Sequence, residues 1–238
     1  MPNYQTNGII IGRTNFGEAD RIVRLLTPDH GKVSAVAKGV RKIKSRLAGH
    51  LELFGDADLS LATGRNLDVI TAARLRWYPH ALAADYEQVN LAYLFGRLAD
   101  RTAQERTPQP ELFAHLSEAL HAADAGARGP LIELWFKLRL LNLIGYRPEL
   151  TACIVCGTHA GSATYAFDAP RGGLVCTNDA GATSRPISTE AVKLWRLLCD
   201  YPYTTIARIA GAADLAAATL PLGDEFYEHH LGHSARTQ

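Results

Sequence analysis

The period of the hydrophobic residues changes at Tyr78-Pro79, and this change constrains the fold more than any other feature of the chain. Before it, short apolar runs rich in β-branched residues alternate with turn residues, a pattern typical of β-strands. After it, apolar residues recur with the spacing of one helix face. The sequence therefore predicts a multidomain α+β chain, with a β domain at residues 1–79 and a helical domain at residues 80–238.

About five short strands are predicted in the β domain. The turn Thr27-Pro28-Asp29-His30-Gly31 separates two of them, because Pro fixes φ, Asp bonds back to the chain and Gly permits positive φ. An open sheet this small would leave bare edges, so we predict a closed barrel. An SH3-like barrel has the same strand count, and the periodicity does not separate the barrel types. The expected strands cover residues 8–14, 21–27, 32–38, 50–62 (a strand pair or one bent strand) and 66–74.

The helical domain is predicted to contain five helices and one irregular segment. The helix at 131–144 is apolar almost all round, which places it at the centre of the domain. Residues 150–187 are rich in Gly, Ala and Thr and form the predicted irregular segment. The helix at 81–105 has an apolar stripe made of Leu82, Tyr86, Val89, Tyr93, Leu94 and Leu98. The other helices are expected at 111–125, 189–201 and 213–232.

The most basic segment, residues 37–46 (AKGVRKIKSR), lies between two predicted strands. Residues 1–80 hold 12 Lys and Arg against 7 Asp and Glu, although the whole chain has a formal net charge of only +1. Cations on a loop can follow a phosphate backbone, and the counterions that they release give sequence-independent, salt-sensitive affinity. A solvated loop is the alternative interpretation. The loop cations are Lys38, Arg41, Lys42, Lys44 and Arg46, and the other cations of the β domain are Arg13, Arg21, Arg24, Lys32, Arg65, Arg74 and Arg76.

Aromatic side chains that could stack on bases are few in this domain. The candidates are Tyr4, Phe16, Phe54, Trp77 and Tyr78, and Phe54 is expected in the core. We therefore expect binding to the nucleic-acid backbone without sequence readout.

Three cysteines of the irregular segment suggest a metal site. Cys153 and Cys156 have the C-x2-C spacing that lets two thiolates converge on Zn²⁺, and Cys176 follows twenty residues later. A four-cysteine site would place the last cysteine at position 179, where this chain has Asp179. Two readings stay open, a structural Zn²⁺ held by these four residues or a metal-free knuckle held by hydrogen bonds and packing. His159 is a spare ligand, and Cys199 is predicted to be a small core residue.

Motifs of catalysis and nucleotide binding are absent from the sequence. It contains no P-loop, no dinucleotide-binding glycine motif, no zinc-protease helix and no nucleophile elbow, so we expect neither an enzyme nor a nucleotide cofactor. His229 and His233 could chelate a metal from one helix face, but a helix C-terminus also favours histidine. The chain start resembles no signal peptide and no apolar run is long enough to cross a membrane, so a soluble cytoplasmic protein without membrane contact is expected.

Several segments together resemble the RecO family of DNA repair proteins. They run nearly end to end, at residues 8–11, 17–23, 26–27, 31–32, 37–47, 153–157, 172–176 and 227–232. The resemblance implies an oligonucleotide/oligosaccharide-binding (OB) barrel followed by a helical domain with a zinc-knuckle-like insertion. It also implies a cytoplasmic, nucleoid-associated protein of DNA recombination in the RecF pathway.

The resemblance implies partners as well. RecO-like proteins bind single- and double-stranded DNA, anneal complementary strands and, with RecR, help RecA to replace single-strand-binding protein (SSB) on gapped DNA. Some also bind the acidic C-terminal tail of SSB in the helical domain, for which Lys137 and Arg139 are our candidate contacts. Two other functions are kept as alternatives: a metal-dependent nuclease or hydrolase using the C-terminal histidines, and a ribosome-associated RNA-binding module.

Overall fold

The computed structural model describes residues 3–159 and 164–232 of the chain. The described residues form two compact units, which divide between Ala127 and Arg128. The barrel and the first three helices belong to the first unit. The remaining helices and a small sheet belong to the second.

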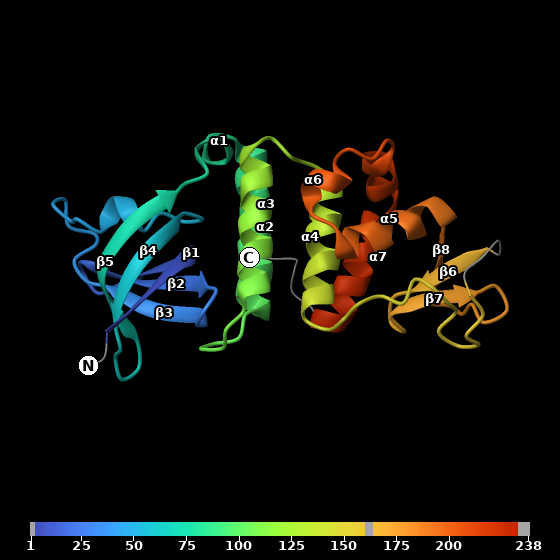
Figure 1. Ribbon diagram of the computed structural model, residues 1–238, viewed down its shortest axis with the longest axis horizontal. Helices are drawn as coiled ribbons and strands as arrows, with labels where there is room; N and C mark the ends of the chain where they lie inside the picture. Colours follow the sequence, from blue (N-terminus) through green and yellow to red (C-terminus); the bar gives the residue numbers. More distant parts are fainter. Residues whose placement is uncertain (1–2, 160–163, 233–238) are drawn as a thin grey trace. The chain divides into compact units, whose positions relative to one another are not determined.

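The first unit begins with a closed five-stranded barrel (Figure 1). Its neighbours follow the order β1-β2-β3-β5-β4, all antiparallel except the β3–β5 pair that runs parallel at Ala35 and Val36. A five-stranded barrel closed by a parallel pair between β3 and β5 is the OB arrangement. The predicted α+β fold with an N-terminal OB barrel is therefore confirmed. The strands are β1 (Asn3–Phe16), β2 (Asp20–Thr27), β3 (Gly31–Ala37), β4 (Asp56–Ala62) and β5 (Asp68–Trp77).

Alternation along β3 fills the barrel as predicted. Val33, Ala35 and Ala37 point into the core, whereas Lys32 and the residues between them are partly exposed. The turn before β3 also forms as expected, with Gly31 at φ 58°.

The predicted strand over residues 50–62 is wrong in its first half. Residues Ala48–His50 form a short 3-10 helix, η1, and only Asp56–Ala62 are a strand. Between them Phe54 takes a left-handed φ of 67°. Its amide donates to the Ile10 carbonyl, while the Ile10 amide donates to Gly55, so the segment binds across β1 before β4 begins.

Three helices complete the first unit: α1 (His80–Ala83), α2 (Tyr86–Thr102) and α3 (Pro110–Asp124). Both α2 and α3 contact the barrel at β1. The predicted apolar stripe of α2 is only partly right, because Tyr86 and Tyr93 are exposed. Leu98 is buried as predicted, and the rest of the buried face uses Phe95 and small residues, among them Gly96, which lets Phe54 approach.

The second unit contains α4 (Pro130–Leu143), α5 (Thr189–Asp200), α6 (Tyr203–Ile206) and α7 (Ala212–Leu231). Helix α4 packs on α5 and α7, and nine of its residues are buried, so its predicted central place is confirmed. Gly223 of α7 permits this packing, because a Cβ there would lie 2.4 Å from a Leu134 methyl group.

The irregular segment contains a small sheet that the sequence did not predict. Its strands are β6 (Tyr165–Asp168), β7 (Gly173–Cys176) and β8 (Ser184–Ile187), in the order β7-β6-β8. Asp168 is fully buried and accepts hydrogen bonds from the hydroxyls of Thr183 and Ser184, which fixes the start of β8.

Within the described ranges, no helix has the length and apolar character to cross a membrane.

Candidate nucleic-acid interface and metal-ligand cluster

The segment Lys38–Arg46, here called the basic loop, connects β3 to η1. Its cations Lys38, Arg41, Lys42, Lys44 and Arg46 are all exposed. None of the five has an acidic partner among the residues that the structure describes. The structure therefore places these predicted contact residues together on one loop, with their charges open to solvent.

The basic loop is held in place by its backbone. Val40 is buried in the barrel core, and Gly39 takes a positive φ of 64°. The Gly39 amide donates to the Asp20 carboxylate at 2.7 Å, and the Arg41 amide donates to the Ala19 carbonyl at 2.9 Å. The loop is thus tied to the β1–β2 hairpin.

Three other predicted contact residues are engaged within the protein. Arg13 pairs with Glu52 at 2.8 Å. Arg24 and Lys32 both pair with Asp100 of α2, at 3.2 and 3.6 Å, and Lys32 also donates to the Asp100 carbonyl. These cations join the barrel to its own helices and loops, so they contribute less free charge than the sequence suggested.

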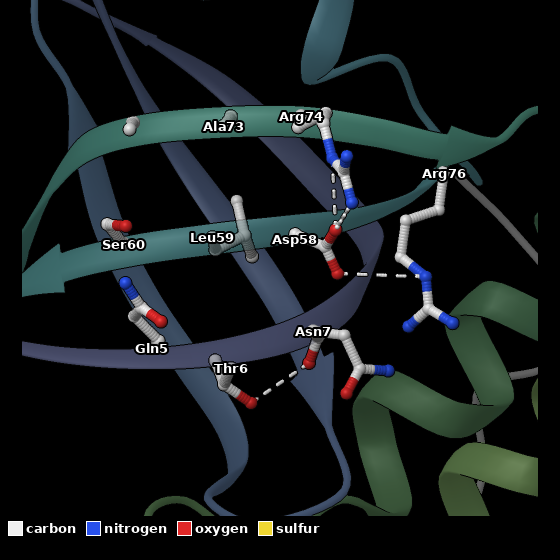
Figure 2. Close-up of a pocket in the computed structure, with 10 residues that line it drawn as sticks. Gln5, Thr6, Asn7, Asp58, Leu59, Ser60, Ala73, Arg74 and Arg76 are labelled. Carbon is white, nitrogen blue, oxygen red and sulfur yellow. Dashed lines mark hydrogen bonds and ion pairs between the residues drawn. The ribbon is translucent and has the colours of Figure 1, made fainter.

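Arg74 and Arg76 line a hollow of about 440 Å³ on the outer wall formed by β1, β4 and β5 (Figure 2). Arg74 pairs with Asp58 at 2.8 Å, and Arg76 lies 3.7 Å from Asp58 and 3.8 Å from Asp56. The polar side chains of Gln5 and Asn7 lie opposite. Carboxylates balance both arginines here, so this wall is less favourable to phosphate than the basic loop.

The last two candidates lie in neither group. Arg21, on β2, donates to the Asn15 side chain at 3.2 Å, and Arg65 is exposed on the loop between β4 and β5. Neither forms an ion pair with any residue in the described ranges.

A buried cluster that the sequence did not indicate supports the Arg65 loop. Asp68 is fully buried, accepts from the Tyr4 hydroxyl at 2.5 Å and from the Gly64 amide, and pairs with Arg106 at 2.8 Å. Burial opposes ionisation of Asp68, but the bonds from Arg106 and Tyr4 outweigh it and hold the pKa of its carboxyl below the ordinary value. Burial and the Asp68 bond raise the pKa of Tyr4 to about 12.

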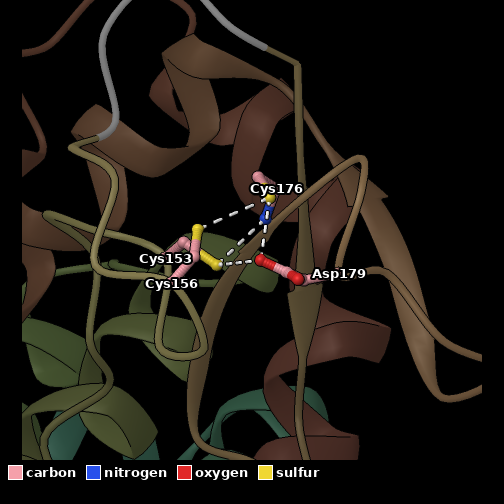
Figure 3. A group of neighbouring side chains, drawn as sticks. All are labelled: Cys153, Cys156, Cys176 and Asp179. Carbon is pink, nitrogen blue, oxygen red and sulfur yellow. Dashed lines mark hydrogen bonds between the residues drawn. The ribbon is translucent and has the colours of Figure 1, made fainter.

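The metal-ligand cluster forms as the sequence predicted. One ligand atom from each of Cys153, Cys156, Cys176 and Asp179 lies within 4.8 Å of the others (Figure 3). The Cys156 and Cys176 sulfurs are 3.8 Å apart, and the Cys176 thiol donates to the Asp179 carboxylate at 3.0 Å. Tetrahedral Zn²⁺ with Zn–S bonds of about 2.3 Å separates two sulfurs by about 3.8 Å. Three thiols and a carboxylate at these distances therefore fit zinc.

The local backbone prepares this cluster. Gly157 takes a positive φ of 74°, which turns the chain so that its amide donates to the Cys153 carbonyl. Burial opposes ionisation of Cys153, but amides that donate to its sulfur lower the pKa of this thiol. The carboxylate of Asp179 raises the pKa of Cys176 to about 11. His159 lies outside the cluster, and Cys199 is buried in α5 as predicted.

Lys137 and Arg139 of α4, the candidate contacts for the C-terminal tail of SSB, differ in their burial and in their partners. Lys137 is nearly fully buried, and its Nζ pairs with Glu133 and with Asp224, the latter at 2.5 Å. Its charge is therefore balanced inside the protein, which counts against a role in binding a partner. Arg139 is half-buried, and its Nη1 is buried without a hydrogen bond to any described residue. Both contacts stay predictions.

The histidine pair at the C-terminus is only partly described. His229 is on α7 and is exposed, whereas His233 lies outside the described residues. The neighbouring His230 packs on Phe226 and lies with its Nε2 3.2 Å from the Ala169 carbonyl oxygen. Burial lowers the pKa of His230, which suits a neutral packing residue.

Comparison with known proteins supplies the family. The family model "Recombination protein O N terminal" matches residues 1–77, and "Recombination protein O C terminal" matches residues 83–238. Proteins named DNA repair protein RecO are 38% identical in Roseiflexus sp. strain RS-1, over 97% of this chain and 80% of that one, and 36% identical in Bifidobacterium adolescentis, over 100% and 98%. A third, from Nocardioides sp. strain JS614, is 38% identical over 91% of each chain. The chain therefore belongs to the RecO family and has a role in DNA repair and recombination.

Proposed function

We propose that this protein binds single- and double-stranded DNA through its phosphates and brings complementary strands together. The observation that carries the proposal is the basic loop, where five exposed cations lie on a fixed backbone and have no acidic partner among the described residues. Phosphate contacts fix position without reading sequence, so the expected binding is general. The Arg65 loop and Arg21 add cations to the same barrel.

Annealing follows from the same charges. Two DNA strands repel each other, and a surface that binds phosphates of both screens this repulsion and raises their local concentration. No bond in the DNA has to be made or broken. We therefore propose a binding protein rather than an enzyme.

Membership of the RecO family supports a role as a recombination mediator. We propose that the protein acts with RecR to load RecA onto gaps coated with SSB, and that it contacts the SSB C-terminal tail. Arg139 is a better candidate than Lys137 for this contact, because Lys137 already pairs with two carboxylates.

We also propose one structural Zn²⁺ at Cys153, Cys156, Cys176 and Asp179. The metal would tie the Cys153–Cys156 turn to the end of β7 and the turn after it. Its contribution is to stability, since structural zinc adds its binding free energy to folding.

The test is a salt titration of DNA binding with two charge-matched variants. Lys42→Ala/Lys44→Ala/Arg46→Ala removes three cations from the basic loop, and Arg185→Ala/Lys193→Ala/Arg208→Ala removes three exposed cations elsewhere. Both change the net charge equally. We expect only the first to weaken binding and to lower the slope of log affinity against log salt, by about 2 on single strands. Equal behaviour of the two variants would contradict the assignment of the loop.

Two further measurements separate the alternatives. Structured RNA that competes better than single-stranded DNA would favour the ribosome-associated module. Cleavage of DNA in the presence of divalent metals would favour the nuclease. An annealing assay with bare and SSB-coated strands tests the mediator role directly.

A further inference from the structure

Two large apolar side chains are exposed at the basic loop and the hairpin bound to it. Ile43 is 105% exposed in the middle of the loop, between Lys42 and Lys44, and Phe16 is 50% exposed at the end of β1. Phosphate binding needs neither of them. A cationic surface that also presents apolar side chains offers two kinds of contact.

The backbone holds Ile43 outward. The Lys42 amide donates to the Gly39 carbonyl, and the Ser45 amide donates to the Lys42 carbonyl. These bonds make two successive turns, and Ile43 lies in the second. Val40 is buried three residues earlier, so the loop is fixed to the barrel on the side away from Ile43. The exposure of Ile43 therefore belongs to a structured loop.

Phe16 lies on the side of the hairpin that faces the basic loop. It is directly opposite Asp20 in the β1–β2 register, and opposed residues of an antiparallel pair have their side chains on the same face. The Asp20 carboxylate accepts the Gly39 amide, at the start of the loop. The Arg41 guanidinium also donates to the carbonyl of Gly17, the residue after Phe16.

The DNA form that offers apolar contact is single-stranded. Unpaired bases expose their faces, and stacking of a base on an aromatic side chain such as Phe16 is strong and tolerant of sequence. The aliphatic Ile43 beside it can add apolar contact. In a duplex these faces are covered by their neighbours. Ile43 and Phe16 can therefore contact bases only where DNA is unpaired or locally unstacked.

Resting on the proposed DNA binding, we propose that Phe16 and Ile43 form a contact for unpaired bases beside the phosphate-binding cations. The surface then prefers single strands. Once bases pair, this contact is lost while the phosphate contacts remain, so the annealed product is bound more weakly than the separate strands. This gives annealing a route to product release.

The test uses two fluorescent 20-mers with equal numbers of phosphates, one of thymidines and one of abasic sites. The protein should bind the thymidine probe about tenfold more tightly, on the scale of one stacked base. Phe16→Ser/Ile43→Ser should bind both probes equally, with the salt slope of the unmodified protein. Phe16→Tyr, which keeps an aromatic ring, should preserve most of the preference.

A matched control is Tyr201→Ser, since Tyr201 is 48% exposed in the second unit. It should leave the preference unchanged. Equal affinity of the unmodified protein for both probes, with a normal salt slope, would overturn the base contact and leave phosphate binding intact. So would a preference that persists in Phe16→Ser/Ile43→Ser, which would reassign the apolar pair to another partner such as a protein. Failure to bind either probe would overturn the proposed function itself.

Discussion

Acidic partners divide the cations of the barrel into two kinds. Arg24 and Lys32 both pair with Asp100, and Arg13 pairs with Glu52. The charges of these three cations are therefore balanced by ion pairs within the protein. The cations of the basic loop have no such partner in the described ranges. A cation is available to DNA only when nothing in the folded chain already neutralises it, and the partner is visible only in three dimensions.

The ion pair at Asp68 predicts a pH-dependent stability. In the folded state the pKa of Asp68 lies below its ordinary value of 3.8, so the ionised carboxylate contributes stability above that pH and loses it as the pH falls. Arg106→Ala removes the cation and should cost about 2 kcal/mol at pH 7, discounted because Arg106 is half exposed. Urea unfolding at pH 7 and below pH 4 should show the loss shrinking at acid pH.

The control for this prediction is Arg74→Ala, since Arg74 pairs with Asp58 at an exposed site. Its effect should stay within about 0.5 kcal/mol at both pH values. A pH-independent loss in Arg106→Ala would mean that packing, and not the charge on Asp68, accounts for the effect.

Two glycines with the same backbone angle make a matched pair. Gly17 and Gly31 have φ of 59° and 58°, but a Cβ on Gly31 would lie 2.1 Å from the Thr107 carbonyl oxygen, whereas nothing lies within 4 Å of one on Gly17. Gly17→Ala should cost about 1 kcal/mol from backbone strain alone. Gly31→Ala should cost at least about 1 kcal/mol more, because residues 104–107 must move. Thermal unfolding of both variants measures the difference, and equal losses would contradict it.

The environment of a single residue was predictable only where the neighbouring sequence determines it. The exposure of the basic loop follows from its charge and its place between strands, and it was predicted. The burial of Lys137 was not, because its partner Asp224 lies 87 residues away and no local pattern joins them. Asp68 and Arg106 gave no signal either. Ile43 was visible as an apolar residue within a basic run, which is the signal that could have found it.

Elements were predictable where they are long and periodic. Helices α3, α4, α5 and α7 lie within a few residues of their expected bounds. Strands β6, β7 and β8 have four residues each, too few for a period to emerge, and their pairing depends on contacts within the folded segment. Helix α2 was found, but its buried face uses alanine and glycine that a search for large apolar residues passes over.

The cluster of Cys153, Cys156, Cys176 and Asp179 predicts how much zinc the protein binds and which variants lose it. Purified protein should contain about one zinc per chain, and Cys176→Ala should lose it, since three donors then remain. Cys199→Ala, at a buried cysteine of α5, should keep it. Asp179→Cys should retain zinc against a chelator for longer, because it completes a four-thiolate site. Elemental analysis and chelator competition measure these outcomes, and a zinc-free unmodified protein would favour the hydrogen-bonded knuckle.

Charge is distributed unevenly along the whole molecule. Residues 1–80 hold the basic excess, residues 81–127 hold 3 Lys and Arg against 7 Asp and Glu, and residues 128–238 hold 10 of each. The acidic residues that offset the barrel are therefore concentrated in the segment containing its own helices, where Asp100 pairs with two of its cations. The sequence revealed the excess, and the structure reveals how much of it is already used.

This distribution limits the salt dependence of DNA binding. Seven barrel cations have no ion pair among described residues: Lys38, Arg41, Lys42, Lys44, Arg46, Arg21 and Arg65. If only these contact phosphates, the slope of log affinity against log salt on single strands should not exceed about 5. All twelve cations of residues 1–80 would give about 8. Titration from low to moderate salt decides between the two, and a slope near 8 would mean that DNA displaces the internal pairs.

The loop between α2 and α3 determines which part of the chain can serve as an independent module. Its backbone forms hydrogen bonds to Lys32 of β3 and to Pro28 in the turn before β3. The apolar residues Ile9 and Leu26 are also buried, although they do not belong to the cluster inside the barrel. A module is portable only when its surface is complete without its neighbours. Grafted onto another protein, residues 1–79 would expose an apolar wall and would leave the backbone groups of Pro28 and Lys32 without the partners that residues 104–109 supply. The smallest piece that could be exchanged between proteins is the barrel with its helical hairpin, residues 1–127.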